Sequence, residues 1–166
     1  TLATIVQLFG EDKGFEFMAG LHANINQYTK SGSAPIKAAA RGESTVGIVF
    51  MHDAVKQAVA GFPITVVAPC EGTGYEIGSM SIIDGARNED SAKAFYDWAL
   101  TAEAQNLALE VNAFQVPSNK SSNTSPAAPN MDDIKLIDYN FTLYGSSDER
   151  RRLLSKWDED ISTLAQ

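Results

Sequence analysis

The stretch TVGIVFMHD, residues 45–53, is an apolar and β-branched run that ends in two polar, titratable side chains, His52 and Asp53. Such a run predicts a strand buried on both faces of a parallel sheet, and residues 54–59 continue at helical spacing. In open α/β sheets, ligands bind beyond the carboxyl ends of the strands, next to the N-terminus of the following helix. His52 and Asp53 are therefore candidate ligand-binding residues. Taken alone, the pair favours a simpler interpretation, in which Asp53 only caps the helix and His52 belongs to a loop.

The rest of the chain alternates between apolar strand-like runs and amphipathic helical patterns. Residues 64–68 and 77–83 predict two further strands, and a polar stretch, 117–130, predicts a surface loop. Helical spacing appears near both ends and in the middle of the chain, at residues 2–9, 12–21, 36–41, 88–100, 101–111 and 147–164. This alternation predicts an α/β fold with one doubly wound, mostly parallel sheet and helices on both faces. His22, at the end of the second helix, is expected at the surface.

Composition limits the function classes. The chain has 166 residues and a formal net charge of -8, which argues against a nucleic-acid partner but leaves an anionic ligand open. Cys70 is the single cysteine, so no intrachain disulfide can form. No stretch is long and apolar enough to predict a membrane span. The chain lacks an initiator methionine, so we expect it to be a fragment of a longer protein.

Two small-residue segments are further candidates for ligand contact. Ser31, Gly32 and Ser33 precede a short helix that has a proline in its first turn. That pattern fits an anion seat or, more commonly, a plain capped helix start. Gly72 and Gly74 flank a threonine and are followed by Tyr75 and Glu76, where glycine allows close backbone approach to a ligand. The glycines precede a predicted strand rather than follow one, so this segment is not a dinucleotide fingerprint.

Taken together and in order, five motifs resemble a known family. They are YTKSGSAP at 28–35, FMHD at 50–53, EGTGYEIG at 71–78, IIDGARN at 82–88 and FYDWAL at 95–100. This pattern resembles the carboxy-terminal lobe of an ABC-transporter solute-binding protein, in the group named for ferric-iron binding. The resemblance implies that residues 1–166 form a single lobe of a type II periplasmic binding protein, without its amino-terminal lobe. It further implies a ligand cleft between two lobes, a membrane ABC permease as partner, and a periplasmic or lipid-anchored extracellular location.

The resemblance also suggests the ligand. Ferric binders of the group place adjacent tyrosines where this chain has Phe50, Met51, His52 and Asp53. The pattern is closer to members that bind phosphorylated sugars, in which a His-Asp pair and a later Glu hold sugar hydroxyls. By that resemblance His52, Asp53 and Glu76 hold the hydroxyls.

The remaining candidates complete the predicted sugar-phosphate site. Tyr75 offers an aromatic face, and Ser31, Gly32 and Ser33 offer hydroxyl and N–H donors to the anionic group. If iron binds instead, its ligands are His52, Asp53, Tyr75 and Glu76. Tyr75 is the one well-placed phenol, because Tyr139 and Tyr144 lie far along the chain. No cofactor and no resident metal are expected.

Two other function classes fit parts of the sequence. An enzyme could use His52 as a general base with Asp53 or Glu76 beside it. The chain has no GxSxG, HExxH or paired CxxC motif, so we expect that it is not an enzyme. The effector-binding domain of a transcription regulator shares the lobe architecture and would require a DNA-binding segment upstream.

Overall fold

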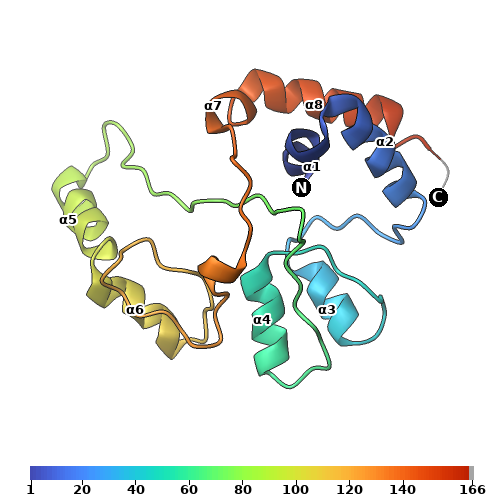
Figure 1. Cartoon of the computed structure of the whole chain (residues 1–166). Coiled ribbons are helices and arrows are strands. Elements are labelled where there is room, and N and C mark those ends of the chain that lie inside the picture. The colour runs from blue at the N-terminus through green and yellow to red at the C-terminus, as the bar shows by residue number, and fades with distance from the viewer. Residues whose placement is uncertain (165–166) are drawn as a thin grey trace. The chain divides into compact units, whose positions relative to one another are not determined.

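The computed structural model describes residues 1–164, and the chain divides into two compact units (Figure 1). Unit 1 consists of Thr1–Thr29, Ala68–Glu76 and Asp132–Gln166, and unit 2 consists of Lys30–Val67 and Ile77–Met131. Each unit is therefore assembled from segments that are distant in the sequence. In the part of the chain that the structure describes, no helix has the length and apolar character needed to cross a membrane.

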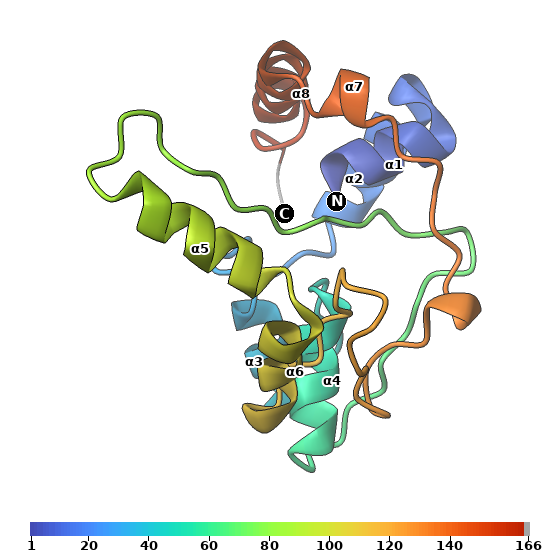
Figure 2. The ribbon, with the colours of Figure 1, turned by 90° about the vertical axis from the view of Figure 1, so that its left-hand side faces the viewer.

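Unit 1 is a helical unit with a continuous apolar core. Its helices are α1 (Leu2–Phe9), α2 (Glu11–His22), the single turn α7 (Phe141–Tyr144) and α8 (Ser147–Asp160), which lie together in both views (Figure 2). The buried core side chains come from α1, α2, α8 and the C-cap of α8, and they are Val6, Phe15, Met18, Leu153 and Ile161. Trp157 packs against this cluster. The sequence predicts that the final helix packs on the sheet through Leu153 and Trp157, whereas these two side chains pack against α1 and α2.

The break between α1 and α2 follows from glycine. Gly10 has φ 80°, a left-handed conformation that ends α1 and begins α2, as the sequence predicts for the end of the first helix. Gly14 then lets α2 approach α1, because a Cβ at this position would stand 3.3 Å from the backbone oxygen of Ile5. The start of α2 differs from the prediction: Gly10 occupies the cap position, and Asp12 lies inside the first turn.

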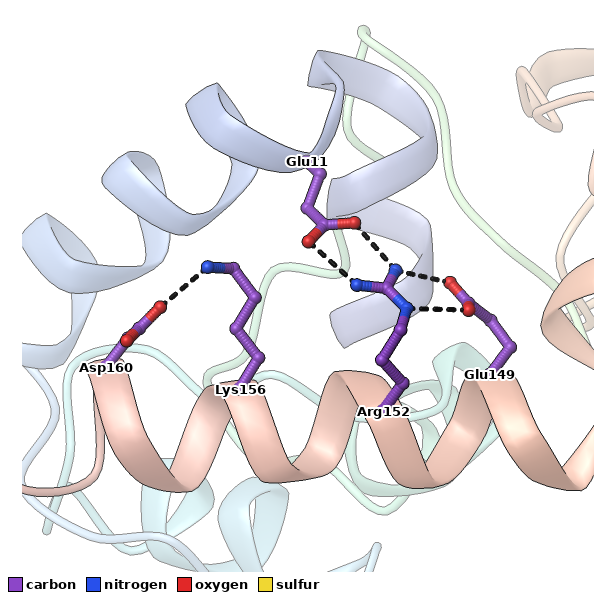
Figure 3. Close-up of polar contacts among 5 residues, drawn as sticks. All are labelled: Glu11, Glu149, Arg152, Lys156 and Asp160. Carbon is purple, nitrogen blue, oxygen red and sulfur yellow. Dashed lines mark hydrogen bonds and ion pairs between the residues drawn. The ribbon is translucent and has the colours of Figure 1, made fainter.

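A charged network fastens the beginning of α2 to α8 (Figure 3). The guanidinium of Arg152 donates two hydrogen bonds to Glu11, at 2.9 and 2.7 Å, and two to Glu149, at 2.8 and 2.7 Å. One turn further along α8, Lys156 pairs with Asp160 at 2.7 Å and stands over the ring of Phe15. The run Arg150–Arg152 predicts a solvated basic face, but Arg152 instead connects α8 to α2.

His22 is buried, with only 3% of its surface exposed, so its expected place at the surface is wrong. Its Nε2 lies 3.1 Å from the carbonyl oxygen of Leu164, and its Nδ1 lies 2.9 Å from the hydroxyl of Tyr28. Because a carbonyl oxygen only accepts, Nε2 carries the proton of the neutral ring and Nδ1 accepts from Tyr28. Both ring nitrogens have partners, which makes burial of this polar side chain tolerable.

Unit 2 contains α3 (Ala34–Ala40), α4 (Met51–Val59), α5 (Glu89–Ala99) and α6 (Ala102–Glu110). A short 3-10 turn, η1 (Met131–Asp133), lies where the chain passes from unit 2 to unit 1. Buried apolar side chains of unit 2 come from α3, α4 and one loop, namely Ile36, Ala40, Ala54, Val55 and Phe114. The apolar spacing of 88–100 and 101–111 predicts a buried stripe on each of these two helices. This prediction is wrong, since neither α5 nor α6 has a buried residue.

The predicted sheet is not found among residues 1–164. The three predicted strand segments, 45–50, 64–68 and 77–83, are irregular, and the described backbone has one isolated parallel bridge, between Thr73 and Leu136. A strand needs a neighbour about 4.8 Å away to satisfy its N–H and C=O groups. No such neighbour is present for these segments in the described residues, and Val46 and Val67 consequently expose 76% and 73% of their surface.

Candidate functional site

His52 and Asp53 lie in the first turn of α4 in unit 2. The helix begins at Met51, with Phe50 in the extended cap position, so neither predicted minor role applies: Asp53 is not the cap and His52 is not in a loop. Nε2 of His52 is 3.8 Å from Oδ1 of Asp53, and the two side chains are 29% and 27% exposed. The ring of Phe50 stacks on His52 with centroids 5.6 Å apart. This is a partly exposed acid–imidazole pair at the positive end of a helix.

Residues 31–33 lie next to the same helix start. Gly32 faces Phe50, since a Cβ on this glycine would stand 3.4 Å from the Phe50 ring. Ser33 occupies the cap position of α3, but its side chain makes no capping hydrogen bond, and its hydroxyl lies 3.4 Å from that of Ser31. The structure thus brings the predicted serine-glycine segment together with the aromatic ring that supports His52.

Gly47 explains how these two segments meet. A Cβ at Gly47 would stand 2.9 Å from the carbonyl oxygen of Pro35, in the first turn of α3. Only glycine allows the 45–50 segment to pass this close to α3. The sequence signal was a glycine inside an apolar run, which marks close backbone approach, but it does not reveal the partner.

Tyr75 and Glu76 belong to unit 1, on a loop that is fixed to two other elements. The N–H of Thr73 donates to the carbonyl of Lys135 at 2.9 Å, and the N–H of Ile137 donates to the carbonyl of Thr73 at 3.0 Å. Gly74 packs directly against the side chain of Thr4 in α1. The loop is therefore held between α1 and the 135–137 segment.

The two glycines of this loop serve the protein's own packing. Gly72 has φ 128°, and a Cβ there would stand 3.0 Å from Cγ2 of Ile137, while a Cβ on Gly74 would overlap the Thr4 hydroxyl. The sequence predicts close approach to a ligand at these glycines, whereas the structure shows close approach to neighbouring chain segments. Their contribution to a site is to hold the backbone that carries Tyr75 and Glu76.

Tyr139 lies beside Tyr75, which sequence reasoning did not find. The rings of Tyr75 and Tyr139 are 6.5 Å apart, and both pack against Phe141, at 5.3 and 4.7 Å. Burial raises the pKa of the Tyr139 phenol, and electrostatic interactions with Glu76 and Tyr144 raise it further. The sequence separation of 64 positions gave no signal for this contact, which depends on the backbone pairing of Thr73.

The predicted site residues form two groups, one in each unit. His52, Asp53 and the 31–33 segment are in unit 2, and Tyr75 and Glu76 are in unit 1. Their convergence on one ligand stays a prediction.

Within residues 1–164, no three His, Cys, Asp or Glu side chains gather closely enough to hold a metal ion. Unit 1 has two shallow hollows, one on α2 and one between α2 and α8, and none of the predicted ligand-binding residues lines either of them.

Comparison with known proteins identifies a matching family and similar solved structures. The family model described as bacterial extracellular solute-binding protein matches residues 3–134. The solved structure of the periplasmic binding protein AfuA from Actinobacillus pleuropneumoniae, with exogenous fructose-6-phosphate bound, is 51% identical in sequence. It superimposes with a TM-score of 0.92 over 98% of this chain and 51% of that chain.

Two further relatives agree. The periplasmic binding protein P5PA is 38% identical, with a TM-score of 0.88 over 97% of this chain and 51% of that chain. An uncharacterized protein of Haemophilus influenzae is 47% identical over 161 residues, which are 96% of this chain and 46% of that protein. This chain thus spans about half the length of its relatives. It belongs to the bacterial extracellular solute-binding protein family.

Proposed function

We propose that this chain is part of the solute-binding component of an ABC importer, and that the intact protein holds a phosphorylated sugar in a cleft between two lobes. The observation that carries this proposal is the similarity to AfuA, whose solved structure contains fructose-6-phosphate, at 51% identity over nearly the whole chain. Membership in a solute-binding family also favours a binding role over an enzymatic one.

Each predicted residue has a chemical task in this proposal. His52, Asp53 and Glu76 exchange hydrogen bonds with sugar hydroxyls, because carboxylates and imidazole accept from O–H groups. Tyr75 packs against the C–H face of the sugar. The hydroxyls and N–H groups of residues 31–33 contribute donors to the phosphate. The partial exposure of His52 and Asp53 supports this assignment, since an accessible side chain can reach a ligand.

The remaining expectations concern the intact protein. Residues 1–166 would be one carboxy-terminal lobe, and the other lobe would come from the half of the polypeptide that this chain does not include. The apolar segments 45–50, 64–68 and 77–83 would become strands of a mostly parallel sheet once strands from that half pair with them. The large exposure of Val46 and Val67 supports such pairing. The protein would act in the periplasm, or lipid-anchored outside the cell, and deliver its ligand to a membrane permease.

The test is ligand binding by the intact protein. Fructose 6-phosphate or glucose 6-phosphate should raise its melting temperature, because a ligand that binds only the native state stabilises it. Ferric citrate should leave the solution colourless, without a phenolate-to-iron absorption band. A strong visible band with iron, together with no thermal shift from any hexose phosphate, would replace this proposal by iron transport.

The matched variants locate the site. His52→Ala or Asp53→Ala should weaken hexose-phosphate binding by about 1.5–3 kcal/mol, the typical value of a hydrogen bond to a charged group. Lys56→Ala is the control, because Lys56 is an exposed residue on the same helix, one turn beyond the pair. If all three variants bind as tightly as the wild-type protein, the assignment of His52 and Asp53 is wrong.

A further inference from the structure

Phe50 occupies a position that phenylalanine suits poorly. It is the cap residue of α4, where serine, threonine, aspartate and asparagine are preferred because their side chains accept a hydrogen bond from the first helical turn. The Phe50 side chain makes no such bond and is 45% exposed, so within the described residues it serves neither as a polar cap nor as a buried core residue. Natural sequences break a local preference mainly at functional sites, which directs attention to what this ring contacts.

The ring of Phe50 lies against the imidazole of His52. The two rings are nearly parallel, with an interplanar angle of 16° and centroids 5.6 Å apart, which is an offset-stacked arrangement. Asp53 does not hold the imidazole in the same way, because Nε2 of His52 is 3.8 Å from Oδ1 of Asp53, beyond hydrogen-bonding distance. The stack on Phe50 is thus the contact that restricts the plane of the His52 ring.

Phe50 is itself held through both its backbone and its ring. Its carbonyl oxygen accepts from the N–H of Asp53 at 3.1 Å and from the N–H of Ala54 at 3.3 Å, which ties it to the first turn of α4. Ala54 is buried, so this turn is anchored. Gly32 leaves room for the ring, since a Cβ on this glycine would already contact Cε2 and Cδ2 of Phe50, at 3.4 and 3.6 Å. All of these contacts lie within unit 2.

We infer that Phe50 is a positioning residue, which holds the imidazole of His52 in the orientation that meets a sugar hydroxyl. This inference rests on the proposed function and adds a residue to its site. A partly exposed histidine can adopt several rotamers, and a ligand that selects one of them must immobilise the side chain. The stack restricts this freedom before the ligand arrives, so less entropy is lost on binding. Phe50 therefore acts through His52 and does not itself bind the ligand.

The test is calorimetry with fructose 6-phosphate on the intact protein. Phe50→Leu and Phe50→Met keep an apolar side chain and remove the aromatic face. Each should weaken binding about two- to tenfold, the affinity equivalent of immobilising one additional side chain. Phe50→Tyr keeps the ring and should bind as the wild type does. Phe62→Leu is the matched control, because Phe62 is an exposed phenylalanine of unit 2 beyond the end of α4, and it should also bind as the wild type does.

Two further measurements separate positioning from a purely structural role. In the His52→Ala background, Phe50→Leu should change the affinity less than about twofold, because the imidazole that Phe50 orients is gone. In the NMR spectrum of the ligand-free protein, the ring current of Phe50 should displace the resonances of the His52 ring protons. Phe50→Leu should abolish this displacement, and Phe50→Tyr should retain it.

Three outcomes would overturn the inference while the proposed function stands. They are wild-type affinity in both Phe50→Leu and Phe50→Met, an equal loss of affinity with and without His52, and His52 ring-proton resonances that do not respond to Phe50→Leu. If the wild-type protein binds no hexose phosphate at all, the proposed function fails, and the positioning role of Phe50 for that ligand fails with it.

Discussion

Helix α8 of unit 1 buries Leu153, and its C-cap residue Ile161, in a core shared with α1 and α2, whereas α5 and α6 of unit 2 bury none of their residues. The sequences of these helices do not reveal this difference in burial, since all three have apolar residues at helical spacing. In unit 1 the apolar stripes face one another. In unit 2 the stripes of α5 and α6 face no described partner that covers them. Amphipathic spacing therefore shows which side of a helix can be buried, and the presence of a partner decides whether it is buried.

The largest expected effect tests this difference directly. Leu153→Ala removes a side chain that is 3% exposed and should destabilise the intact protein by about 2–5 kcal/mol, the usual range for such a cavity. Leu107→Ala in α6, where the side chain is 44% exposed, should cost less than about 1 kcal/mol. Denaturant unfolding of both variants measures the two values. Equal losses would show that the apolar face of α6 is buried in the intact protein, and the contrast between the units would disappear.

The two histidines sharpen the comparison on a smaller scale. His22→Ala in unit 1 leaves the Tyr28 hydroxyl and the Leu164 carbonyl without their partner, which should cost about 1–3 kcal/mol of stability. His52→Ala in unit 2 should change the free energy of unfolding by less than about 0.5 kcal/mol. The side chain is partly exposed, and it loses only the 3.8 Å contact with Asp53 and the stacking on Phe50.

Thermal unfolding without ligand separates the two roles. His22→Ala should melt earlier yet bind ligand at low temperature, whereas His52→Ala should melt like the wild type and bind weakly. A stability loss at His52 as large as that at His22 would mean that His52 supports the fold rather than the site.

The smallest expected effect concerns the charged network of unit 1. Hydrogen bonds from Arg152 lower the pKa of Glu11 and Glu149 below the ordinary carboxyl value of 4.5. A depressed carboxyl pKa adds stability above 4.5, and this contribution is lost as the pH falls through the lowered value of the folded state. Arg152→Gln should therefore flatten the loss of melting temperature on acidification below pH 4.5.

Surface charges are screened, so this effect should also shrink in high salt. Arg150→Gln, on an exposed position of the same helix, is the control and should retain the acid sensitivity of the wild type. If Arg152→Gln and Arg150→Gln show the same melting curve as the wild type at every pH, the clamp between α2 and α8 contributes nothing to stability.

Much of the local structure was predictable because it depends on residues a few positions apart. Gly10 ends α1, Pro35 lies in the first turn of α3, and the Thr101 hydroxyl accepts from the N–H of Ala104 at the start of α6. Acidic residues stand in the first turn of α5, as the helix dipole favours. Each of these signals acts within one helical turn, so neighbouring residues are enough to establish it.

The candidate site was predictable only in part. The residue types and their order identified the family, and the comparison with solute-binding proteins confirms that identification. The alternation of apolar runs also predicted a sheet, which the described residues do not form. A helix satisfies its backbone within its own segment, whereas a strand needs a partner segment, and the sequence of one strand does not supply that partner.

The sequence by itself determined where most of the longer helices lie, which family the chain belongs to, and which side chains are chemically suited to a polar ligand. Only the tertiary structure decided that His22 is buried, that Gly72 and Gly74 serve internal packing, and that Tyr139 stands beside Tyr75. The physical reason is distance along the chain. Local steric and hydrogen-bonding preferences act between near neighbours, whereas these three outcomes depend on side chains that only folding brings into contact.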